Sequence, residues 1–360
     1  MDAIDAALVE IGRAGFRLAA RHSHPIPESL KARLASLCRP GVQAGDALDL
    51  LGEADCWFGE VLAEAVAALL AQASCPASAV TAIGSHGQTV RHRPPGASVR
   101  YPFSCQIGDP NILAARTGIA VVADFRRRDI AVGGQGAPLV PPFHRAAFAH
   151  PDRVRAIVNV GGIANLTHLT PNGAVLGFDI GPGNCLMDGW VQRHHSAAFD
   201  DCGRWAASCE PDAQLLACLK LHPFFACSPP KSTGREDFHL GWIDDELARR
   251  GALAPGCVQA TLLELTAMAI AEAVNALSPA IEELYLCGGG AYNTALLNRL
   301  RELLSPLKID TTSHLGLDPE WVEAVAFAWL ARETLSGRPG NLPAVTGAAR
   351  AVVLGAVYPA

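Results

Sequence analysis

Three glycine clusters directly follow apolar stretches in the second half of the chain. Gly161-Gly162 follows AIVNV, Gly181-Pro182-Gly183 follows GFDI, and Gly288-Gly289-Gly290 follows ELYLC. Glycine lets the backbone approach a ligand closely, and successive N–H groups in such turns can converge on an anion. Each cluster alone could equally be a tight turn of an α/β protein. The repetition therefore leaves two interpretations open, a site for nucleotide phosphates and a set of ordinary turns.

Two familiar phosphate-binding motifs do not fit these clusters. Lys231-Ser232-Thr233 follows Pro229-Pro230 and lacks the glycines of a G-x-x-x-x-G-K-[ST] loop. Gly181-Pro182-Gly183 does not complete G-x-G-x-x-G, because Leu186 stands at the final position. A nucleotide bound by this chain would have to be held by another fold.

Asp179 is the carboxylate best placed for catalysis. It ends the apolar stretch GFDI and is followed at once by the glycine turn 181–183. A general base must reach the proton that it removes, and the tip of a strand provides such a position. The alternative role is to cap the helix that is expected to start near Asn184.

Other polar groups are less specific. The segment GSHGQTVRH, residues 84–92, follows a strand and could be a substrate contact or a plain loop. The segment 124–135, with three arginines and several glycines, could form a lid or a sugar clamp. Glu323 stands in an apolar helix-like stretch, where a single glutamate usually faces solvent.

Length and composition indicate an ordinary globular protein of two domains. The chain has 360 residues, half of them apolar, and a formal charge of −6. Since only Arg126–Arg128 form a basic block, nucleic acid and membrane surfaces are not expected as partners. The first residues do not resemble a secretory signal, and the apolar stretch 260–277 contains Glu264 and Glu272, so we expect a cytoplasmic protein without a membrane span.

The eleven cysteines are scattered singly. There is no Cys-x-x-Cys pair and no histidine pair at ligand spacing, so we expect free, buried thiols and assign no metal ligands.

The pattern of apolar residues predicts an α/β organisation. A long helix is expected over 43–72, and a strand, a helix and a strand over 79–84, 109–117 and 118–125 imply a parallel sheet. The Pro-rich stretch that follows places the domain boundary at 135/136, giving a first lobe over 1–135 and a second over 136–360, from which the extreme C-terminus can return to the first. In the second lobe strands are expected over 155–162, 163–170 and 174–184, and Asn172-Gly173 predicts a hairpin between the last two. Further elements are expected as helices over 184–194, 212–221, 258–277, 293–304 and 321–334, with a strand over 283–287.

These motifs together resemble a known family. In chain order they are AIGSHGQTVRH, QIGDPNILAARTGIAVVADFRRRDIAVGGQGAPLVPPFH, NVGGIANLTHL, GFDIGPGNCLMDGW, PPKSTGREDF, LCGGGAYNTALLNRL, WVEAVAFAWLA and PGNLPAVTGA. They closely resemble the motifs of anhydro-N-acetylmuramic acid kinases, from about residue 82 to the C-terminus. The resemblance implies an α/β protein with two ribonuclease-H-like lobes of the actin-like ATPase fold and ATP in an interlobe cleft.

The resemblance also implies the reaction. ATP, water and 1,6-anhydro-N-acetylmuramic acid give N-acetylmuramic acid 6-phosphate and ADP, a step of peptidoglycan recycling and amino-sugar metabolism. The anhydro bridge leaves no free 6-hydroxyl, so water must open the ring at the anomeric carbon. The family's catalytic aspartate falls on Asp179, which would take the proton of that water.

Further residue roles come from the same resemblance. Glu323 matches a family glutamate at the sugar, which reverses its solvent-facing interpretation, and His86, Gln106 and Arg127 lie in matching substrate-side motifs. ATP is expected at Asp2, Gly161, Gly162, Asn165, Gly181, Gly183, Gly288, Gly289 and Gly290. Mg²⁺ would neutralise the phosphates, with no protein ligand assigned to it, and the family suggests a homodimer.

The first residues match only the end of a family motif. Members usually open with a strand and a loop G-L-M-S-G-T-S-x-D-G-x-D, whereas MDAIDAALVEI begins inside it. We therefore expect a chain that lacks the N-terminal phosphate loop, with a sheet edge exposed and weaker nucleotide binding. Two alternatives to the hydrolysing kinase follow: an actin-like ATP-binding protein with lost or reduced catalysis, and a conventional kinase for a free 6-hydroxyl.

Overall fold

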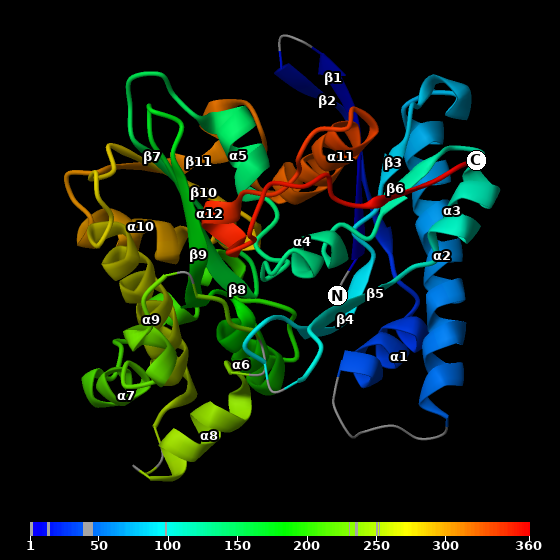
Figure 1. Cartoon of the computed structure of the whole chain (residues 1–360). Helices are drawn as coiled ribbons and strands as arrows, with labels where there is room; N and C mark the ends of the chain where they lie inside the picture. Colours follow the sequence, from blue (N-terminus) through cyan, green and yellow to red (C-terminus); the bar gives the residue numbers. More distant parts are fainter. Residues whose placement is uncertain are drawn as a thin grey trace. The chain divides into compact units, whose positions relative to one another are not determined.

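The computed structural model describes residues 3–12, 15–38, 46–97, 99–229, 231–234, 237–249, 251 and 253–360 (Figure 1). The chain forms two compact units. Unit 1 contains residues 1–143 and 323–360, and unit 2 contains residues 144–322. Each unit is an α/β structure and is described by itself.

Unit 1 holds three small sheets. The antiparallel hairpin of β1 (Ala3–Gly12) and β2 (Gly15–Pro25) forms one, and β4 (Gln88–Arg93) with β5 (Phe103–Ile107) forms another. In the third, β3 (Ile83–Gly84) pairs in parallel with β6 (Val121–Ala123), which also pairs with β12 (Ala356–Tyr358). The strand, helix and strand predicted over 79–125 therefore do form a parallel pair, with α3 (Pro110–Thr117) between them.

The long helix α2 (Ala47–Gln72) organises the interior of unit 1. Its N-cap is Asp46, whose side chain accepts a hydrogen bond from the backbone N–H of Leu48, and it ends at the predicted residue. The predicted start at residue 43 lies outside the described residues. The buried face of α2 packs against α1 (Glu28–Cys38) through Leu30, Leu34, Phe58 and Val61.

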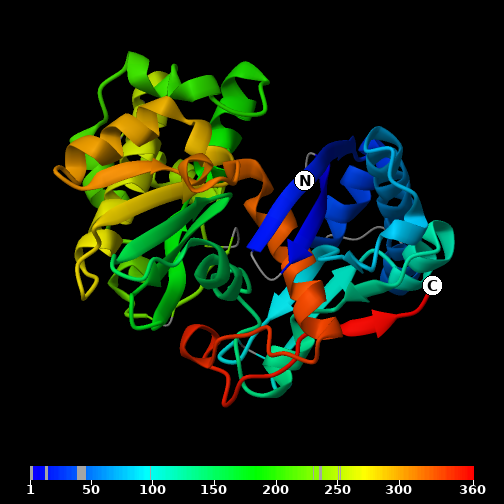
Figure 2. The same ribbon diagram turned by 90° about the horizontal axis from the view of Figure 1, so that it is seen from above.

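The C-terminal part of the chain belongs to unit 1. Helix α11 (Val322–Leu335) leads into α12 (Pro343–Thr346) and then β12, and the C-terminus lies beside α3 in Figures 1 and 2. The change of unit falls after Phe143, not after residue 135, because Gln135 donates its backbone N–H to the carbonyl of Thr346 and so stays with unit 1. The return to unit 1 begins at Glu323 and is longer than the extreme C-terminus.

A buried carboxylate ties this return to the loop after α4 (Arg127–Ala131). The side chain of Asp129 is fully buried and accepts hydrogen bonds from the backbone N–H of Gly136 at 2.8 Å, from Asn341 Nδ2 at 2.7 Å and from Thr346 Oγ1 at 2.8 Å. Three donors around a buried carboxylate replace the water that it loses on folding. Asp129 therefore fastens α12 to the glycine-rich loop.

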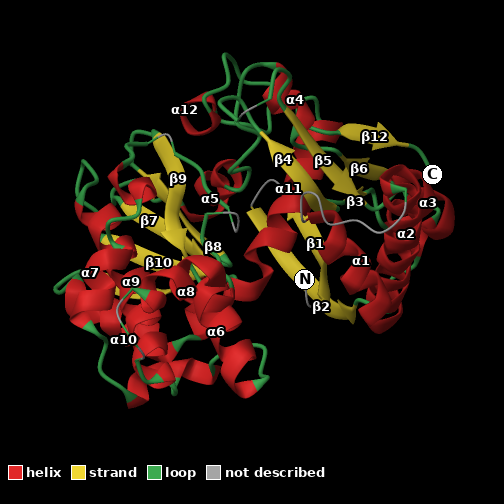
Figure 3. Ribbon diagram, turned by 90° about the horizontal axis from the view of Figure 1, so that it is seen from below, coloured by secondary structure: helices red, strands yellow, loops and turns green. Residues whose placement is uncertain are grey.

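Unit 2 contains a five-stranded sheet in the order β11-β10-β7-β8-β9. The antiparallel strands β7 (Arg155–Val160), β8 (Ile163–Leu169) and β9 (Val175–Pro182) come first, and the predicted turn at Asn172-Gly173 joins β8 to β9. Strands β10 (Glu283–Cys287) and β11 (Lys308–Thr311) then extend the sheet in parallel from β7. Figure 3 shows these strands in yellow with the helices around them in red. An antiparallel meander extended by parallel strands is the strand order of a ribonuclease-H-like lobe.

Helices complete unit 2. Helix α5 (Pro141–Phe148) precedes the sheet. After β9 come α6 (Cys185–His195), α7 (Ala213–Leu219), α8 (Leu240–Ala248) and α9 (Pro255–Asn275), and α10 (Thr294–Leu303) follows β10. Helix α9 is long and apolar enough to cross a membrane by length and composition alone, but its burial agrees with the expectation that this stretch is not a membrane span. It is the core helix of unit 2, with 78% of its most apolar window buried.

The cysteines are free thiols as expected, but most are not buried. Only Cys287 is buried, and Cys56, Cys202 and Cys227 are exposed. The expectation of burial was wrong because most of these cysteines lie on helix surfaces and in loops rather than in the sheets.

Candidate active site

A row of polar side chains crosses the meander of unit 2. In the strand register Asn159 of β7 lies opposite Asn165 of β8, and Asn165 lies opposite Asp179 of β9. Each side chain is partly accessible, although the residues around them are mostly buried. A β-bulge between Ala164 and Asn165 shifts the register next to Asp179, and such bulges re-aim side chains beside active sites. Two of the predicted residues, Asn165 and Asp179, are thus cross-strand neighbours.

The first two glycine clusters lie against each other at the end of this row. The turn that enters α6 is fastened to the β7–β8 turn by hydrogen bonds from Gly183 N to Gly162 O at 3.0 Å and from Asn184 N to Gly161 O at 2.8 Å. A Cβ at position 183 would stand 2.3 Å from the carbonyl oxygen of Gly161. Only glycine allows the two turns to approach so closely.

The third cluster reaches the same end of the sheet. A Cβ on Gly288 would meet Asn159 Oδ1 at 2.3 Å, and one on Gly290 would meet the side chain of Val160 at 2.3 Å. Gly288 also has a φ of +76°, which other residues rarely adopt. The structure therefore brings all three glycine clusters together around the ends of β7 and β9.

Asp179 is contacted by a segment that the sequence analysis had set aside. Its Oδ2 accepts hydrogen bonds from Ser232 Oγ at 2.9 Å and from the backbone N–H of Thr233 at 3.0 Å. The backbone N–H of Asp179 donates to the carbonyl of Lys231 at 3.1 Å. The presence of Lys-Ser-Thr directly after two prolines was visible in the sequence, but its distance of 53 residues from Asp179 hid the contact.

Asp179 does not cap α6. The N-cap is Asn184, which makes no side-chain cap hydrogen bond in this described segment and instead donates its amide to the carbonyl of Val160 at 3.0 Å. The capping alternative for Asp179 is therefore wrong, because the turn 181–183 places the carboxylate on β9 before the helix begins.

In unit 1, His86 pairs with Arg126. Arg126 donates to His86 Nε2 from Nη2 at 2.8 Å, and the imidazole packs on Phe327 of α11 with 4.7 Å between ring centroids. Desolvation and the charge of Arg126 lower the pKa of His86 to about 3. His86 is consequently neutral at physiological pH. Because Nε2 accepts, we assign its proton to Nδ1.

Glu323 lies one helical turn before Phe327, at the start of α11. Its side chain is exposed at the surface. Desolvation by the surrounding protein raises the pKa of its carboxyl, the charge of Arg126 lowers this pKa, and the charge of Asp5 raises it. Arg126 thus acts electrostatically on both Glu323 and His86.

Arg127 and Gln106 have other partners. Arg127 binds Asp124 through Nε at 2.8 Å, and this hydrogen bond raises the pKa of the guanidinium. Gln106 Nε2 donates to Thr89 Oγ1 of the neighbouring strand β4 at 3.0 Å and to Ser104 Oγ of its own strand β5 at 2.7 Å. The arginine that contacts His86 is therefore Arg126, which the sequence analysis did not single out. Asp2 lies outside the described residues.

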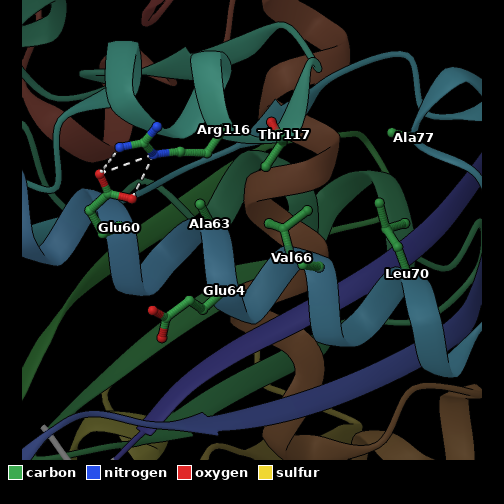
Figure 4. A pocket seen from close by; sticks show the side chains of 9 residues that line it. Glu60, Ala63, Glu64, Val66, Leu70, Ala77, Arg116 and Thr117 are labelled. Carbon is green, nitrogen blue, oxygen red and sulfur yellow. Dashed lines mark hydrogen bonds and ion pairs between the residues drawn. The ribbon is translucent and has the colours of Figure 1, made fainter.

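A surface hollow in unit 1 is unrelated to these residues. It has a volume of about 370 Å³ and lies between α2 and α3, lined by Glu60, Glu64, Val66, Leu70 and Arg116 among others (Figure 4). Glu60 and Arg116 pair across it at 2.7 Å. None of the predicted site residues is among those that line it.

The donor set suits Mg²⁺ carried by phosphates better than Mg²⁺ held by the protein. Among the described residues no group of three histidine, cysteine or acidic side chains could hold a metal ion. Mg²⁺ usually keeps several waters and binds one or two carboxylates together with substrate phosphates, so a cage of protein ligands is not required.

The strand order of unit 2, with glycine turns and a carboxylate at one end of the sheet, is that of an α/β protein of the actin-like ATPase class. Sequence comparison identifies the family. The family description "Anhydro-N-acetylmuramic acid kinase" matches residues 1–360, and the chain belongs to this family of kinases.

Curated relatives agree with the family. The chain is 50% identical to the anhydro-N-acetylmuramic acid kinase of Shewanella halifaxensis over 361 residues, covering 100% of this chain and 96% of the relative. It is 52% identical to the enzyme of Shewanella amazonensis with the same coverage, and 49% identical to that of Saccharophagus degradans, covering 99% of this chain and 95% of the relative.

Solved structures show weaker similarity. A ROK family glucokinase from Streptomyces griseus in complex with glucose and AMPPNP is 14% identical, with a TM-score of 0.36, covering 88% of this chain and 93% of the other. Component A of the (R)-2-hydroxyglutaryl-CoA dehydratase of Acidaminococcus fermentans is 12% identical, with a TM-score of 0.44, covering 89% and 95%. These values add nothing to the family assignment.

Proposed function

We propose that Asp179 is the general base with which this kinase opens the anhydro ring of 1,6-anhydro-N-acetylmuramic acid. The observation that carries the proposal is the position of Asp179, which is the cross-strand neighbour of Asn165 and lies beside the converging glycine turns of unit 2. A carboxylate fixed on a strand next to a phosphate-binding turn is suited to remove a proton while a phosphoryl group is transferred nearby.

The reaction can be written with all bonds accounted for. Asp179 takes a proton from water as the water oxygen bonds to the anomeric carbon of the sugar. The bond between that carbon and O6 breaks, O6 bonds to the γ-phosphorus of ATP, and the bond between this phosphorus and ADP breaks. The products are N-acetylmuramic acid 6-phosphate and ADP.

The glycine turns are proposed to bind ATP. Gly161 and Gly162 would contribute backbone N–H groups to the phosphates, with the Asn165 side chain beside them. Gly181 and Gly183 would let the second turn approach the phosphates closely, and Gly288, Gly289 and Gly290 would lie under the adenosine. The close contacts of these turns leave no room for side chains at positions 183, 288 and 290, as a phosphate cradle of backbone groups requires. Mg²⁺, when bound to the phosphates, would neutralise their charge.

Residues of unit 1 are proposed to contact the sugar. Glu323 is exposed and could accept hydrogen bonds from sugar hydroxyls, and neutral His86 is held by Arg126 as a fixed polar group. Gln106 and Arg127 are proposed as further sugar contacts. Asp2 is proposed to contribute to ATP binding on the family resemblance alone.

We also propose that the protein is a homodimer that works in the cytoplasm. The family resemblance favours the homodimer, and the free thiols favour a reducing compartment such as the cytoplasm. Sedimentation equilibrium with the purified protein tests the homodimer: a single species of twice the 37.8 kDa chain mass supports it, and a monomer contradicts it.

The test compares three reactions of the purified protein in H₂¹⁸O, with ATP alone, with ATP and the anhydro sugar, and with ATP and N-acetylmuramic acid. The proposal predicts 6-phosphate only with the anhydro sugar and no ¹⁸O in its phosphate. Transfer to N-acetylmuramic acid would favour a conventional kinase, and ATP binding without any product would favour an inactive actin-like protein.

The Asp179→Asn variant tests the base. It should lower kcat about 10²–10⁴-fold, the usual contribution of general base catalysis. Asp244→Asn is the matched control, because Asp244 is an exposed aspartate of unit 2 that pairs with Arg193. Full activity of Asp179→Asn would remove the base assignment.

A further inference from the structure

We propose that the segment Lys231–Thr233 is a positioning element for Asp179 and that the Ser232 hydroxyl is the part of it that tunes catalysis. This inference rests on the proposed role of Asp179 as general base. The sequence Lys231-Ser232-Thr233 lacks the glycines of a phosphate loop, and no role has so far been given to these three residues.

The segment lies along the outer edge of β9. Strand β9 is the last strand of the sheet as described, and its Asp179 donates its backbone N–H to the carbonyl of Lys231 at 3.1 Å. The two residues that follow Lys231 then turn back onto the Asp179 side chain. One short segment therefore holds both the backbone and the carboxylate of the same residue.

Both side-chain contacts are made to one oxygen. Ser232 Oγ and the backbone N–H of Thr233 donate to Asp179 Oδ2 at 2.9 and 3.0 Å. Two donors on Oδ2 fix the rotation of the carboxylate plane, which a single donor would leave variable. A base must be held within about 0.5 Å and 10–20° of its productive position for efficient proton transfer.

The segment is itself held at both of its ends. Thr233 Oγ1 donates to Asp237 Oδ2 at 2.6 Å, which closes the turn on one side. On the other side Lys231 Nζ lies 4.5 Å from the centre of the Phe224 ring and donates to the carbonyl of Phe224 at 3.4 Å. These anchors make the segment a fixed support.

The same support reaches the glycine turn. Phe225 follows Phe224, and its ring would stand 2.8 Å from a Cβ on Gly181. Phe225 thus packs against Gly181 of the glycine turn, while the neighbouring Phe224 holds Lys231. The position of the base and that of the phosphate turn are therefore set by one connected group of side chains.

The test is the Ser232→Ala variant of the full chain, assayed with ATP and the anhydro sugar. The loss of one exposed hydrogen bond should lower kcat about three- to ten-fold, with the KM for ATP within about two-fold of wild type. Because hydrogen bonds to a carboxylate favour its ionised form, the acid limb of the kcat profile should move to higher pH. Ser232→Thr, which keeps a hydroxyl, should restore most of the rate and the pH profile.

The control is Ser208→Ala, which removes an exposed hydroxyl of unit 2 that donates to the nearby carbonyl of Trp205 at 2.7 Å. It should leave kcat and the pH profile unchanged. If Ser232→Ala has the wild-type rate and pH profile while Asp179→Asn is inactive, the positioning role is wrong and the base assignment stands. If Asp179→Asn is itself active, the proposed function fails and this inference fails with it.

Discussion

The contact between Gly183 and Gly161 allows a quantitative prediction. In a Gly183→Ala variant the new methyl group would stand 2.3 Å from the Gly161 carbonyl oxygen, 3.1 Å from Ala164 N and 3.2 Å from Ile163 C. All three are backbone atoms, so no side chain can swing aside. The two turns must separate, which stretches the hydrogen bonds from Gly183 N to Gly162 O and from Asn184 N to Gly161 O.

The size of the effect follows from these contacts. Overpacking costs about 1–3 kcal/mol, and each weakened hydrogen bond adds about 1 kcal/mol. At about 2–4 °C per kcal/mol for a unit of this size, unit 2 should unfold on the order of 10 °C earlier. Because the separation displaces the β7–β8 turn that is proposed to bind the phosphates, the affinity for ATP should fall as well.

Gly161→Ala is the matched control from the same pair of turns. A Cβ there would have its nearest neighbour, Ile163 O, at 3.6 Å, which is an ordinary contact, so the Tm should stay close to that of wild type. Differential scanning calorimetry gives the unfolding temperatures, and titration calorimetry with ATP gives the affinities. A Gly183→Ala protein that melts and binds ATP like wild type would refute the steric argument.

Two further predictions concern stability. Asp129→Asn should destabilise unit 1 by about 2–4 kcal/mol in urea unfolding, because its new NH₂ group would face one of three buried donors. Asp152→Asn, at an exposed position, should have little effect. Equal stability of both variants would contradict the role of Asp129. Acid should destabilise the protein as the pH falls from about 6.5. In the folded state the pKa values of His86, His92 and His144 are about 3, 4 and 3, so in this pH range only the unfolded chain binds protons at these histidines. Each such histidine contributes a slope of about 1.4 kcal/mol per pH unit, so His144→Gln should reduce the slope of unfolding free energy against pH by one proton, and an unchanged slope would show that His144 titrates normally.

Most elements of unit 2, though not α8 or β11, could be predicted because they depend on local patterns. The turn at Asn172-Gly173, the apolar stretches before each glycine cluster and the helical spacing over α9 and α10 are all visible within short windows. The same holds for the last residue of α2 in unit 1, whereas its N-cap at Asp46 was not predicted.

Other elements were missed because tertiary contacts define them. The strands β4 and β5 are separated by residues 94–102 rather than by a two-residue hairpin turn, so the first strand was interpreted as a loop. Helix α5 begins with two prolines, which favoured a linker, although proline is tolerated in the first turn of a helix.

The candidate site could likewise be predicted only where its contacts depend on local sequence. The approach of the first two glycine turns follows from strands that are close in sequence, and Asp179 could be singled out from its own neighbours. The contact of Asp179 with Ser232 joins residues 53 apart, and the contact of His86 with Arg126 joins residues 40 apart. Such pairs are set by the packing of whole elements, so no short motif could indicate them.

The segment 231–233 has a second consequence, which concerns solubility. An edge strand offers a row of unpaired N–H and C=O groups to which another chain can add, and such edges are sites of aggregation. On β9 the hydrogen bond from Asp179 N to Lys231 O occupies part of that edge, and Lys231 brings a positive charge to it. The residues that orient the carboxylate therefore also protect the sheet against pairing with a neighbouring molecule.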